Sequence, residues 1–449
     1  MIDEKTELVI NNCETEQREV WGSRFGYMMA TLGMAIGLGA MWRFPYVVAM
    51  NGGGAFVFAY IIISLLIAVP GAIAEVSFGK WARTGPVDAF QKILGKGGKV
   101  IGSIVPLVPL GMNMYYLVIV GWVLAYIFFT ITGSCMNTES VAFFAEFIGN
   151  RWGQFAWAML ALALTAIACL GGIKGGIEKI CKYMLPLLYI ILIVLLIRVL
   201  TLPGIVKGIE YYTIPDWKQL LKPELWVAAL GMSLFAMGLG PAFLLTYGSY
   251  LPEKADCTLD ILTVAIWNIL GCLMSGFIII PSVILYNLDL DTGPSLVFTV
   301  LPKVFKQMPG SSLTAFAFFV ALFFAAYSSG IAIMEVPVTA IIDSLGWERK
   351  KTVLTISLIT AIGIVPCVWS DTFLLKFDYI TSNLGYTLAT TLVIISLAWF
   401  YGAEKVREEW LNPTSEIKLG PWYDFLLKYI TTPVLIYLLY EAIKAARNL

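Results

Sequence analysis

The chain has 449 residues, of which 59% are hydrophobic and only 13% are charged. Soluble domains carry roughly a quarter charged residues, so this composition excludes an ordinary soluble protein. The 30 basic and 30 acidic residues give a formal net charge of zero, and no histidine occurs. A neutral chain gives no indication of nucleic-acid binding, and the lack of histidine removes most transition-metal sites.

The chain contains many apolar stretches about 20 residues long, which is the length of a helix that crosses a bilayer. Backbone groups in lipid have no water to bond, so only helices or closed barrels cross it, and these stretches are too long for barrel strands. The sequence therefore predicts an all-α polytopic membrane protein surrounded by membrane lipid. We expect about eleven spans, at residues 23–48, 54–80, 99–133, 152–171, 180–201, 225–250, 259–286, 311–345, 352–370, 377–401 and 423–446.

Lysine and arginine are concentrated in the short loops that follow spans two, four, eight and ten, for example Lys80, Lys174 and Arg349. Loops rich in these residues stay on the cytoplasmic side of a membrane. The sequence thus predicts a multi-pass protein of the inner cell membrane with a cytoplasmic N-terminus.

Two predicted spans, the first and the sixth, contain Gly-Leu-Gly near the middle, at residues 37–39 and 238–240. Glycine weakens a helix interior, and Pro241, directly after the second motif, removes a backbone donor. Small residues also serve close helix packing in membranes, but a matched pair with proline favours two broken helices. Paired interrupted spans in two halves of a chain indicate a transporter site. Unwound carbonyls suit a cation, and freed N–H groups suit a carboxylate.

These breaks lie five spans apart, which makes the two halves inverted repeats. We expect residues 1–20 to form a cytoplasmic segment, residues 21–201 the first repeat and residues 202–401 the second. Residues 402–449 then hold a linker and the eleventh span.

The sequence GLGAMWRFP at residues 37–45, followed by NGGGAF at residues 51–56, resembles the neurotransmitter:sodium symporter family. The likeness continues through Tyr115-Tyr116, residues 246–250, the segment 293–298 and the SSG sequence at 328–330, and it runs from about residue 18 to the end. It looks like the shorter, leucine-transporter-like bacterial members with eleven spans. The resemblance implies a five-plus-five inverted repeat with a peripheral eleventh span, and sodium-driven uptake of a small amino acid.

The resemblance also implies where sodium binds. The family's second sodium site uses only oxygen ligands, which suit a small hard cation. Serines within a span can instead bond back to their own helix, so the adjacent serines Ser328 and Ser329 alone would not indicate a sodium site. The implied Na+ ligands are the carbonyls of Gly33, Ile36 and Ala325 and the hydroxyls of Ser328 and Ser329.

The family's other ion sites match poorly. Ala40 and Ala236 stand where the family's first sodium site has an Asn and a Thr or Ser side chain, and only Asn268 matches. Near the family's chloride position the chain has Met232 and Cys272, so neither a chloride site nor a substitute carboxylate is visible. We therefore expect one sodium ion per cycle and no chloride.

The same mapping implies a substrate pocket. The amides of Leu38 and Gly39 and the hydroxyl of Tyr116 would hold a carboxylate, and Gly37 stands where monoamine carriers have Asp. These features favour a neutral amino acid with an apolar, aromatic or sulfur-containing side chain. Its amine would meet the carbonyls of Ala35, Phe235 and Ala236, and its side chain would be lined by Met34, Met112, Phe235, Gly238, Pro241, Ser329 and Ile333. A purely structural role explains Met34 and Met112 equally well, because methionine fills irregular gaps in protein interiors.

Charges inside a span cost roughly 2.5–3.5 kcal/mol unless paired, so each is a functional candidate. Arg43 and Asp378 match the family's outer gate, although ordinary boundary charges are the alternative. The inner gate would pair Arg18 with Asp343, with Trp21 as a plug and Tyr250 nearby.

Two acids within spans remain. We expect Glu75 to hydrogen-bond the broken backbone of the sixth span. Glu335 stands where relatives commonly have Gln, and it would either pair with a nearby cation or carry a proton.

The leading interpretation is a sodium-coupled amino-acid symporter. The alternatives are a sodium-independent or proton-linked exchanger that uses Glu335, and a sensor that binds solute without transporting it. The sequence contains no nucleophile–base set or metal cluster, so we do not expect an enzyme. The exact substrate and the oligomeric state are not predicted.

Overall fold

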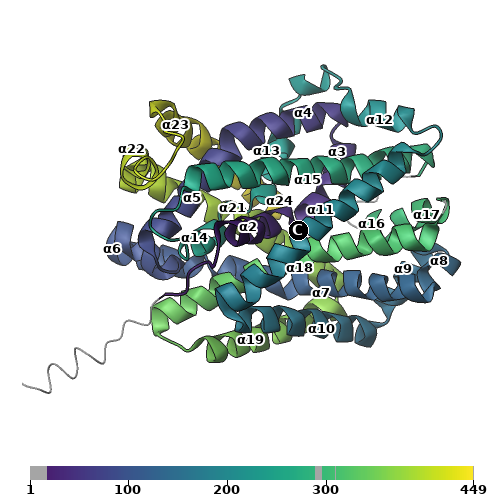
Figure 1. The fold of residues 1–449 in the computed structure, drawn as a ribbon, viewed down its shortest axis with the longest axis horizontal. Helices are drawn as coiled ribbons and strands as arrows, with labels where there is room; N and C mark the ends of the chain where they lie inside the picture. Colours follow the sequence, from purple (N-terminus) through teal and green to yellow (C-terminus); the bar gives the residue numbers. More distant parts are fainter. Residues whose placement is uncertain (1–17, 289–295, 309, 448–449) are drawn as a thin grey trace, which may run out of the picture.

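The computed structural model describes residues 18–288, 296–308 and 310–447 (Figure 1). Nearly all of this part of the chain is helical, and the β-structure found in it is one isolated bridge between Gly53 and Pro215. Residues 293–295 of the family-like segment 293–298 and residues 1–17 of the predicted cytoplasmic segment lie outside the described residues, whereas residues 296–298 belong to a short helix.

Ten helical stretches in the described ranges are long and apolar enough to cross a membrane. They are Arg24–Met50, Gly54–Ala82, Pro86–Thr132, Arg151–Leu170, Ile173–Leu200, Cys257–Leu285, Ser311–Leu345, Arg349–Trp369, Asp371–Leu411 and Pro421–Ala446. The remaining predicted span, at 225–250, is divided into two short helices. It consists of α13 (Pro223–Met237) and α14 (Phe243–Gly248), and neither half alone has spanning length. The predicted all-α polytopic fold is confirmed.

The first span is interrupted too. α2 (Arg24–Leu38) contains a non-helical residue at Gly37 and continues through a π-helical turn (Gly39–Arg43) into α3 (Phe44–Met50). The third stretch starts earlier than predicted, because the amphipathic helix α6 (Pro86–Ile104), kinked at Gly95, precedes α7 (Leu107–Thr132).

The long helices run side by side in one bundle (Figure 1). α18 (Ser311–Leu345) lies inside it and packs against both α2 and α7. The other spanning helices are α4 (Gly54–Ile63) with α5 (Val69–Ala82), α10 (Arg151–Leu170), α11 (Lys179–Leu200), α15 (Cys257–Leu285), α19 (Arg349–Trp369), α20 (Asp371–Asp378) with α21 (Tyr386–Ile395), and α24 (Thr432–Ala446).

Short helices lie at the two ends of the bundle. α8 (Ser134–Asn137), α9 (Ser140–Gly149), α12 (Val206–Thr213), α16 (Leu296–Thr299) and α17 (Leu301–Lys306) gather at one end. α6, α22 (Ala403–Lys405) and α23 (Pro421–Phe425) lie at the other, where the described chain begins (Figure 1). We call this second end the amino-terminal end.

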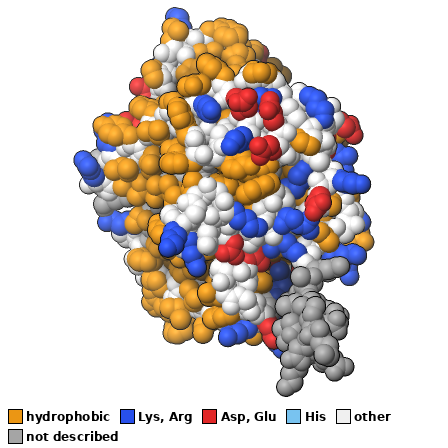
Figure 2. Space-filling model, turned by 90° about the vertical axis from the view of Figure 1, so that its left-hand side faces the viewer, with side chains coloured by type: hydrophobic (Ala, Val, Ile, Leu, Met, Phe, Trp, Pro, Cys, Tyr) orange, Lys and Arg blue, Asp and Glu red, His pale blue; other side chains and the backbone are white. Residues whose placement is uncertain are grey.

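Seen from the amino-terminal end, charged side chains of both signs gather on part of the surface, beside broad hydrophobic areas (Figure 2). Large apolar residues on the outer helices are exposed, for example Ile167 on α10 and Ile190 and Ile197 on α11. An apolar outer surface is stable in lipid and unstable in water, so the chain is a multi-pass membrane protein.

Candidate functional site

The break in the first span is fixed by a close backbone approach. Gly37 has φ −14° and ψ −159°, which interrupts α2. A Cβ atom placed on Gly37 would lie 2.2 Å from Oγ of Ser329 on α18. Only glycine fits this contact, so α18 packs directly against the unwound backbone.

The break in the sixth span is held by a buried carboxyl group. Gly238 and Gly240 adopt φ of +66° and +123°, values that glycine tolerates best. Glu75, fully buried on α5, accepts hydrogen bonds from the Gly240 amide at 2.7 Å and from the Leu245 amide at 3.4 Å. The hydroxyl of Thr390 donates to the Leu239 carbonyl at 2.9 Å. The unwound polar groups therefore have partners that a continuous helix would not need.

Beside the first break, four oxygens from α2 and α18 converge. The Ser328 hydroxyl lies 2.9 Å from the Gly33 carbonyl oxygen and 3.0 Å from that of Ala325. The Ser329 hydroxyl also lies 2.9 Å from the Gly33 oxygen. Ser328 bonds back to its own helix at Phe324 as well. We call these oxygens of Gly33, Ala325, Ser328 and Ser329 the serine site, and an all-oxygen set of this kind suits a hard cation. Ile36 is buried in the same α2 segment.

A small cavity of 30 Å³ lies between the two breaks, and we call it the central cavity. Most of the predicted substrate-binding residues line it, and Ala236 and Pro241 are the exceptions. The sequence did not indicate Phe243 or Tyr386, although Phe243 is the first residue of the half-helix that restarts after Pro241. The lining is Met34, Ala35, Gly37, Leu38, Gly39, Met112, Tyr116, Phe235, Gly238, Phe243, Ser329, Ile333 and Tyr386.

Two polar groups of the cavity wall converge on one point. The Leu38 amide donates to the Tyr116 hydroxyl oxygen across a long distance of 3.4 Å. A hydrogen bond of this length is weak, so a carboxylate oxygen that accepts from both groups would replace it at little cost. The ring of Phe235 rests on Gly39, where an added Cβ would lie 2.8 Å from Cε1.

A wider space of 450 Å³, which we call the vestibule, adjoins the central cavity and shares Leu38, Gly39, Tyr116 and Phe235 with it. Arg43 lines the vestibule, donates to Oδ1 of Asn383 at 3.0 Å and lies 4.8 Å from the Phe235 ring centroid.

Asp378 lines the same space as Arg43. Among the ion pairs of the described residues, none joins Arg43 to Asp378. The two residues predicted as the outer gate therefore line one space without forming an ion pair.

The opposite side of the central cavity, toward the amino-terminal end, is closed. Arg18 Nη1 lies 2.7 Å from Asp343 Oδ2, and the Arg18 guanidinium also donates to the carbonyl and hydroxyl of Ser249. The Trp21 indole, only 7% exposed, donates to the Tyr247 carbonyl at 2.9 Å. The Arg18 guanidinium also lies 4.7 Å from the ring centroid of Tyr250. The central cavity therefore adjoins the vestibule on one side and is closed by packed side chains on the other.

Glu335, fully buried on α18, faces Arg349 at the start of α19. Glu335 Oε2 lies 2.7 Å from Arg349 Nη2, and Oε1 accepts from the Tyr250 hydroxyl at 3.1 Å. Arg349 Nε donates to the Cys169 carbonyl at 2.7 Å. The buried acid therefore has a fixed cationic partner, which is one of the two roles expected for it.

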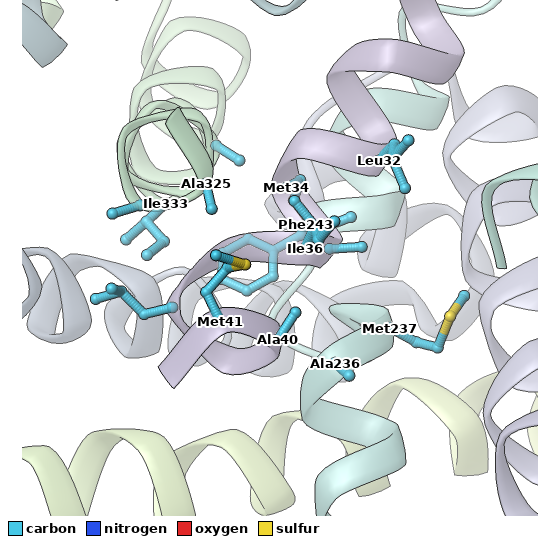
Figure 3. Close-up of a cluster of buried hydrophobic side chains, with 14 of the residues drawn as sticks. Leu32, Met34, Ile36, Ala40, Met41, Ala236, Met237, Phe243, Ala325 and Ile333 are labelled. Atoms are coloured by element: carbon cyan, nitrogen blue, oxygen red, sulfur yellow. The ribbon is translucent and has the colours of Figure 1, made fainter. Parts of the chain in front are cut away.

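The region of the family's first sodium site carries few side-chain oxygens. Ala40 and Ala236 are fully buried methyl groups near the two breaks (Figure 3). Asn268 Nδ2 donates to the Ala236 carbonyl at 3.0 Å, and Asn268 Oδ1 has no hydrogen-bond partner among the residues that the structure describes. The Tyr60 hydroxyl nearby donates to Cys272 Sγ at 3.2 Å.

A helical bundle with two interrupted spans, a cation-type oxygen cluster at one break and a cavity open to one side defines a secondary membrane transporter. The chain belongs to the sodium:neurotransmitter symporter family, whose sequence profile matches residues 18–146 and 138–449. It is a sodium-dependent transporter of that family and not an enzyme.

Comparisons with individual relatives support this family assignment. The chain is 32% identical to an uncharacterized sodium-dependent transporter of Methanocaldococcus jannaschii, with 94% of this chain and 89% of the relative covered. It is 28% identical to the sodium- and chloride-dependent GABA transporter 2 of Mus musculus, covering 92% and 77%. The crystal structure of MhsT in complex with L-phenylalanine superposes with a TM-score of 0.85 at 30% identity, covering 95% of this chain and 100% of that one.

Proposed function

We propose that the protein is a sodium-coupled symporter that imports a neutral amino acid by alternating access. The convergence of the Ser328 and Ser329 hydroxyls on the Gly33 carbonyl carries this proposal, because oxygens clustered beside the central cavity would bind a cation next to the substrate. MhsT, of the same fold, was crystallised with L-phenylalanine. The apolar lining here likewise favours an apolar, aromatic or sulfur-containing side chain.

The serine site and the central cavity share a residue, which supports coupling. Ser329 contributes its hydroxyl to the serine site and also lines the cavity against Gly37. A sodium ion at the serine site would draw the Ser329 oxygen toward itself and fix the cavity wall. Bound sodium then favours substrate binding, and substrate favours sodium binding by the same factor.

We propose that one sodium ion is transported per cycle, without chloride. Ala40 and Ala236 offer methyl groups where a second cation would need side-chain oxygens, and the Asn268 amide nitrogen already bonds the Ala236 carbonyl. The Tyr60 hydroxyl faces Cys272, and the chain has Met232 and Cys272 where the resemblance would place a chloride ligand or a substitute acid. One charge moved through 100 mV supplies ~2.3 kcal/mol, or about fiftyfold accumulation before any sodium gradient is added.

The open vestibule and the closed amino-terminal end correspond to an outward-facing state, if the amino-terminal end is cytoplasmic as its basic loops predict. Substrate then enters through the vestibule past Phe235. The Arg18–Asp343 pair, Trp21 and Tyr250 form the inner gate, and Arg43 with Asp378 closes the vestibule later in the cycle.

The proton-linked alternative is not favoured. It requires Glu335 to exchange protons during the cycle, but Glu335 faces the permanent cation Arg349 at 2.7 Å. This ion pair stabilises the charged carboxylate.

The test is uptake into proteoliposomes of the purified protein, with the twenty amino acids screened under an inward sodium gradient and a negative internal potential. We expect uptake of a neutral amino acid that needs sodium, has a sodium Hill coefficient near one and is unchanged when gluconate replaces chloride. Uptake with potassium in place of sodium would contradict the symport, and two charges per substrate would contradict the single sodium ion.

A further inference from the structure

The central cavity is too small for its proposed substrate. Its 30 Å³ compares with the ~10–15 Å³ that one water molecule needs and the ~300–1,000 Å³ of ordinary ligand pockets. The vestibule can hold part of a ligand, but the side-chain end of an amino acid must enter the space between the two breaks. At least one lining side chain therefore has to move when a substrate with a bulky side chain binds.

Met34 occupies that space. It lies on α2, one turn before the first break. A Cβ atom placed on Gly238 would lie 2.3 Å from Met34 Sδ and 3.0 Å from Met34 Cε. The thioether thus rests directly on the Gly238 backbone, and Phe243 Cδ2 lies 3.8 Å from the same point. The room that a glycine leaves in the pocket floor is filled by this methionine.

Met34 is also a lining side chain that can leave at low cost. Methionine is unbranched and has three rotatable side-chain bonds, so it repacks easily. Phe235 is held between the Arg43 guanidinium and the Tyr386 ring, with ring centroids 5.4 Å apart in the aromatic pair. Phe235 is thus fixed by contacts of its own, whereas the Met34 side chain makes packing contacts only among the residues that the structure describes.

We propose that Met34 determines the size of the substrate side chain, because its thioether and that side chain compete for the space above Gly238. Small side chains bind with Met34 in place. Bulky side chains bind only after Met34 has left the cavity, so their affinity is lowered by the free energy of that displacement. This inference rests on the proposed function, since it concerns an amino acid in the central cavity.

The experiment is equilibrium binding to the purified full-length protein at saturating sodium, with glycine, alanine, leucine, phenylalanine and tryptophan as ligands. Met34→Ala is compared with the wild type and with Met41→Ala. Met41 is a fully buried methionine of the same span that does not line the cavity, so its truncation controls for loss of packing. We expect Met34→Ala to raise the affinity for phenylalanine relative to alanine by about tenfold or more, and Met41→Ala to leave that ratio within about twofold.

An unchanged ratio in a folded, ligand-binding Met34→Ala protein overturns the inference. If that variant does not fold, Met34→Leu takes its place, because leucine keeps a similar volume but is branched and less able to swing aside. We then expect the phenylalanine-to-alanine affinity ratio to fall severalfold, and no change again overturns the inference. Failure of the wild type to bind any amino acid overturns the proposed function, and with it the inference, and is recognised before any variant is made.

Discussion

Glu335 Oε2 and Arg349 Nη2 form a 2.7 Å ion pair that joins α18 to α19, with the carboxylate fully shielded from solvent. Removing one partner of a buried pair leaves an uncompensated charge, which typically costs ~3 kcal/mol or more. We therefore predict that Glu335→Gln lowers the free energy of unfolding by ~3 kcal/mol. The measurement is denaturant unfolding in detergent.

The same variant separates a structural role from a proton role. If Glu335 only pairs with Arg349, Glu335→Gln keeps the wild-type pH profile of uptake. The double variant Glu335→Gln/Arg349→Gln should regain part of the lost stability, because it contains no unpaired charge. A pH profile that flattens in Glu335→Gln would instead favour the proton-linked exchanger.

Ser328→Ala tests the serine site. The substitution removes a hydroxyl that lies 2.9 Å from the Gly33 oxygen, so a cation there would lose one of its few ligands. We predict that the sodium concentration for half-maximal uptake rises about tenfold or more, since hydrogen bonds and contacts to charged groups contribute ~1.5–3 kcal/mol. The matched control is Ser275→Ala, a buried serine that bonds the Met41 carbonyl of the same broken span. An equal shift in both variants would show a general packing effect.

Tyr116→Phe tests the carboxylate position. The Tyr116 hydroxyl faces the Leu38 amide, and its loss leaves a carboxylate one donor short. We predict a rise in KM of about 10- to 100-fold, as for loss of a hydrogen bond to a charged group. Tyr115→Phe is the control, because the Tyr115 hydroxyl faces Ser382 and not Leu38. Comparable KM values in Tyr116→Phe and wild type would place the carboxylate elsewhere.

Arg18→Ala tests the closed amino-terminal end. The substitution removes the ion pair to Asp343 and two hydrogen bonds to Ser249. We predict a shift toward the inward-open state, seen as amide hydrogen exchange at residues 18–32 that is faster by at least tenfold. The control is Arg83→Ala, whose 3.2 Å pair with Glu253 is exposed and worth little. Equal exchange in the two variants would contradict a gating role for Arg18.

The sequence was sufficient for the architecture because its signals are local. Span length, the two Gly-Leu-Gly motifs and Pro241 each act on their own stretch of backbone, and both breaks are found where they were expected. The ten spanning stretches and the broken sixth span account for the eleven predicted spans.

Side-chain partners were harder to predict, because they join segments that only the fold brings together. Arg349 was counted as a basic loop residue, yet it enters the bundle to meet Glu335. Glu178 bonds the Gly22 amide and the Ser23 hydroxyl near the start of α2, a contact between residues more than 150 positions apart. The sequence predicts which methionines line the cavity but not their direction, and only the structure shows that Met34 points at Gly238.

The carboxyl group of Glu75 has a consequence for motion. It lies on α5 and holds the Gly240 and Leu245 amides on either side of Pro241, which has no amide hydrogen of its own. If the gap between α13 and α14 became one continuous helix, the buried Glu75 carboxyl group would lose both of these hydrogen bonds. We therefore expect the gap to persist through the whole transport cycle. Because Glu75 links the sixth span to the second, we expect the two spans to move together as a single rigid body.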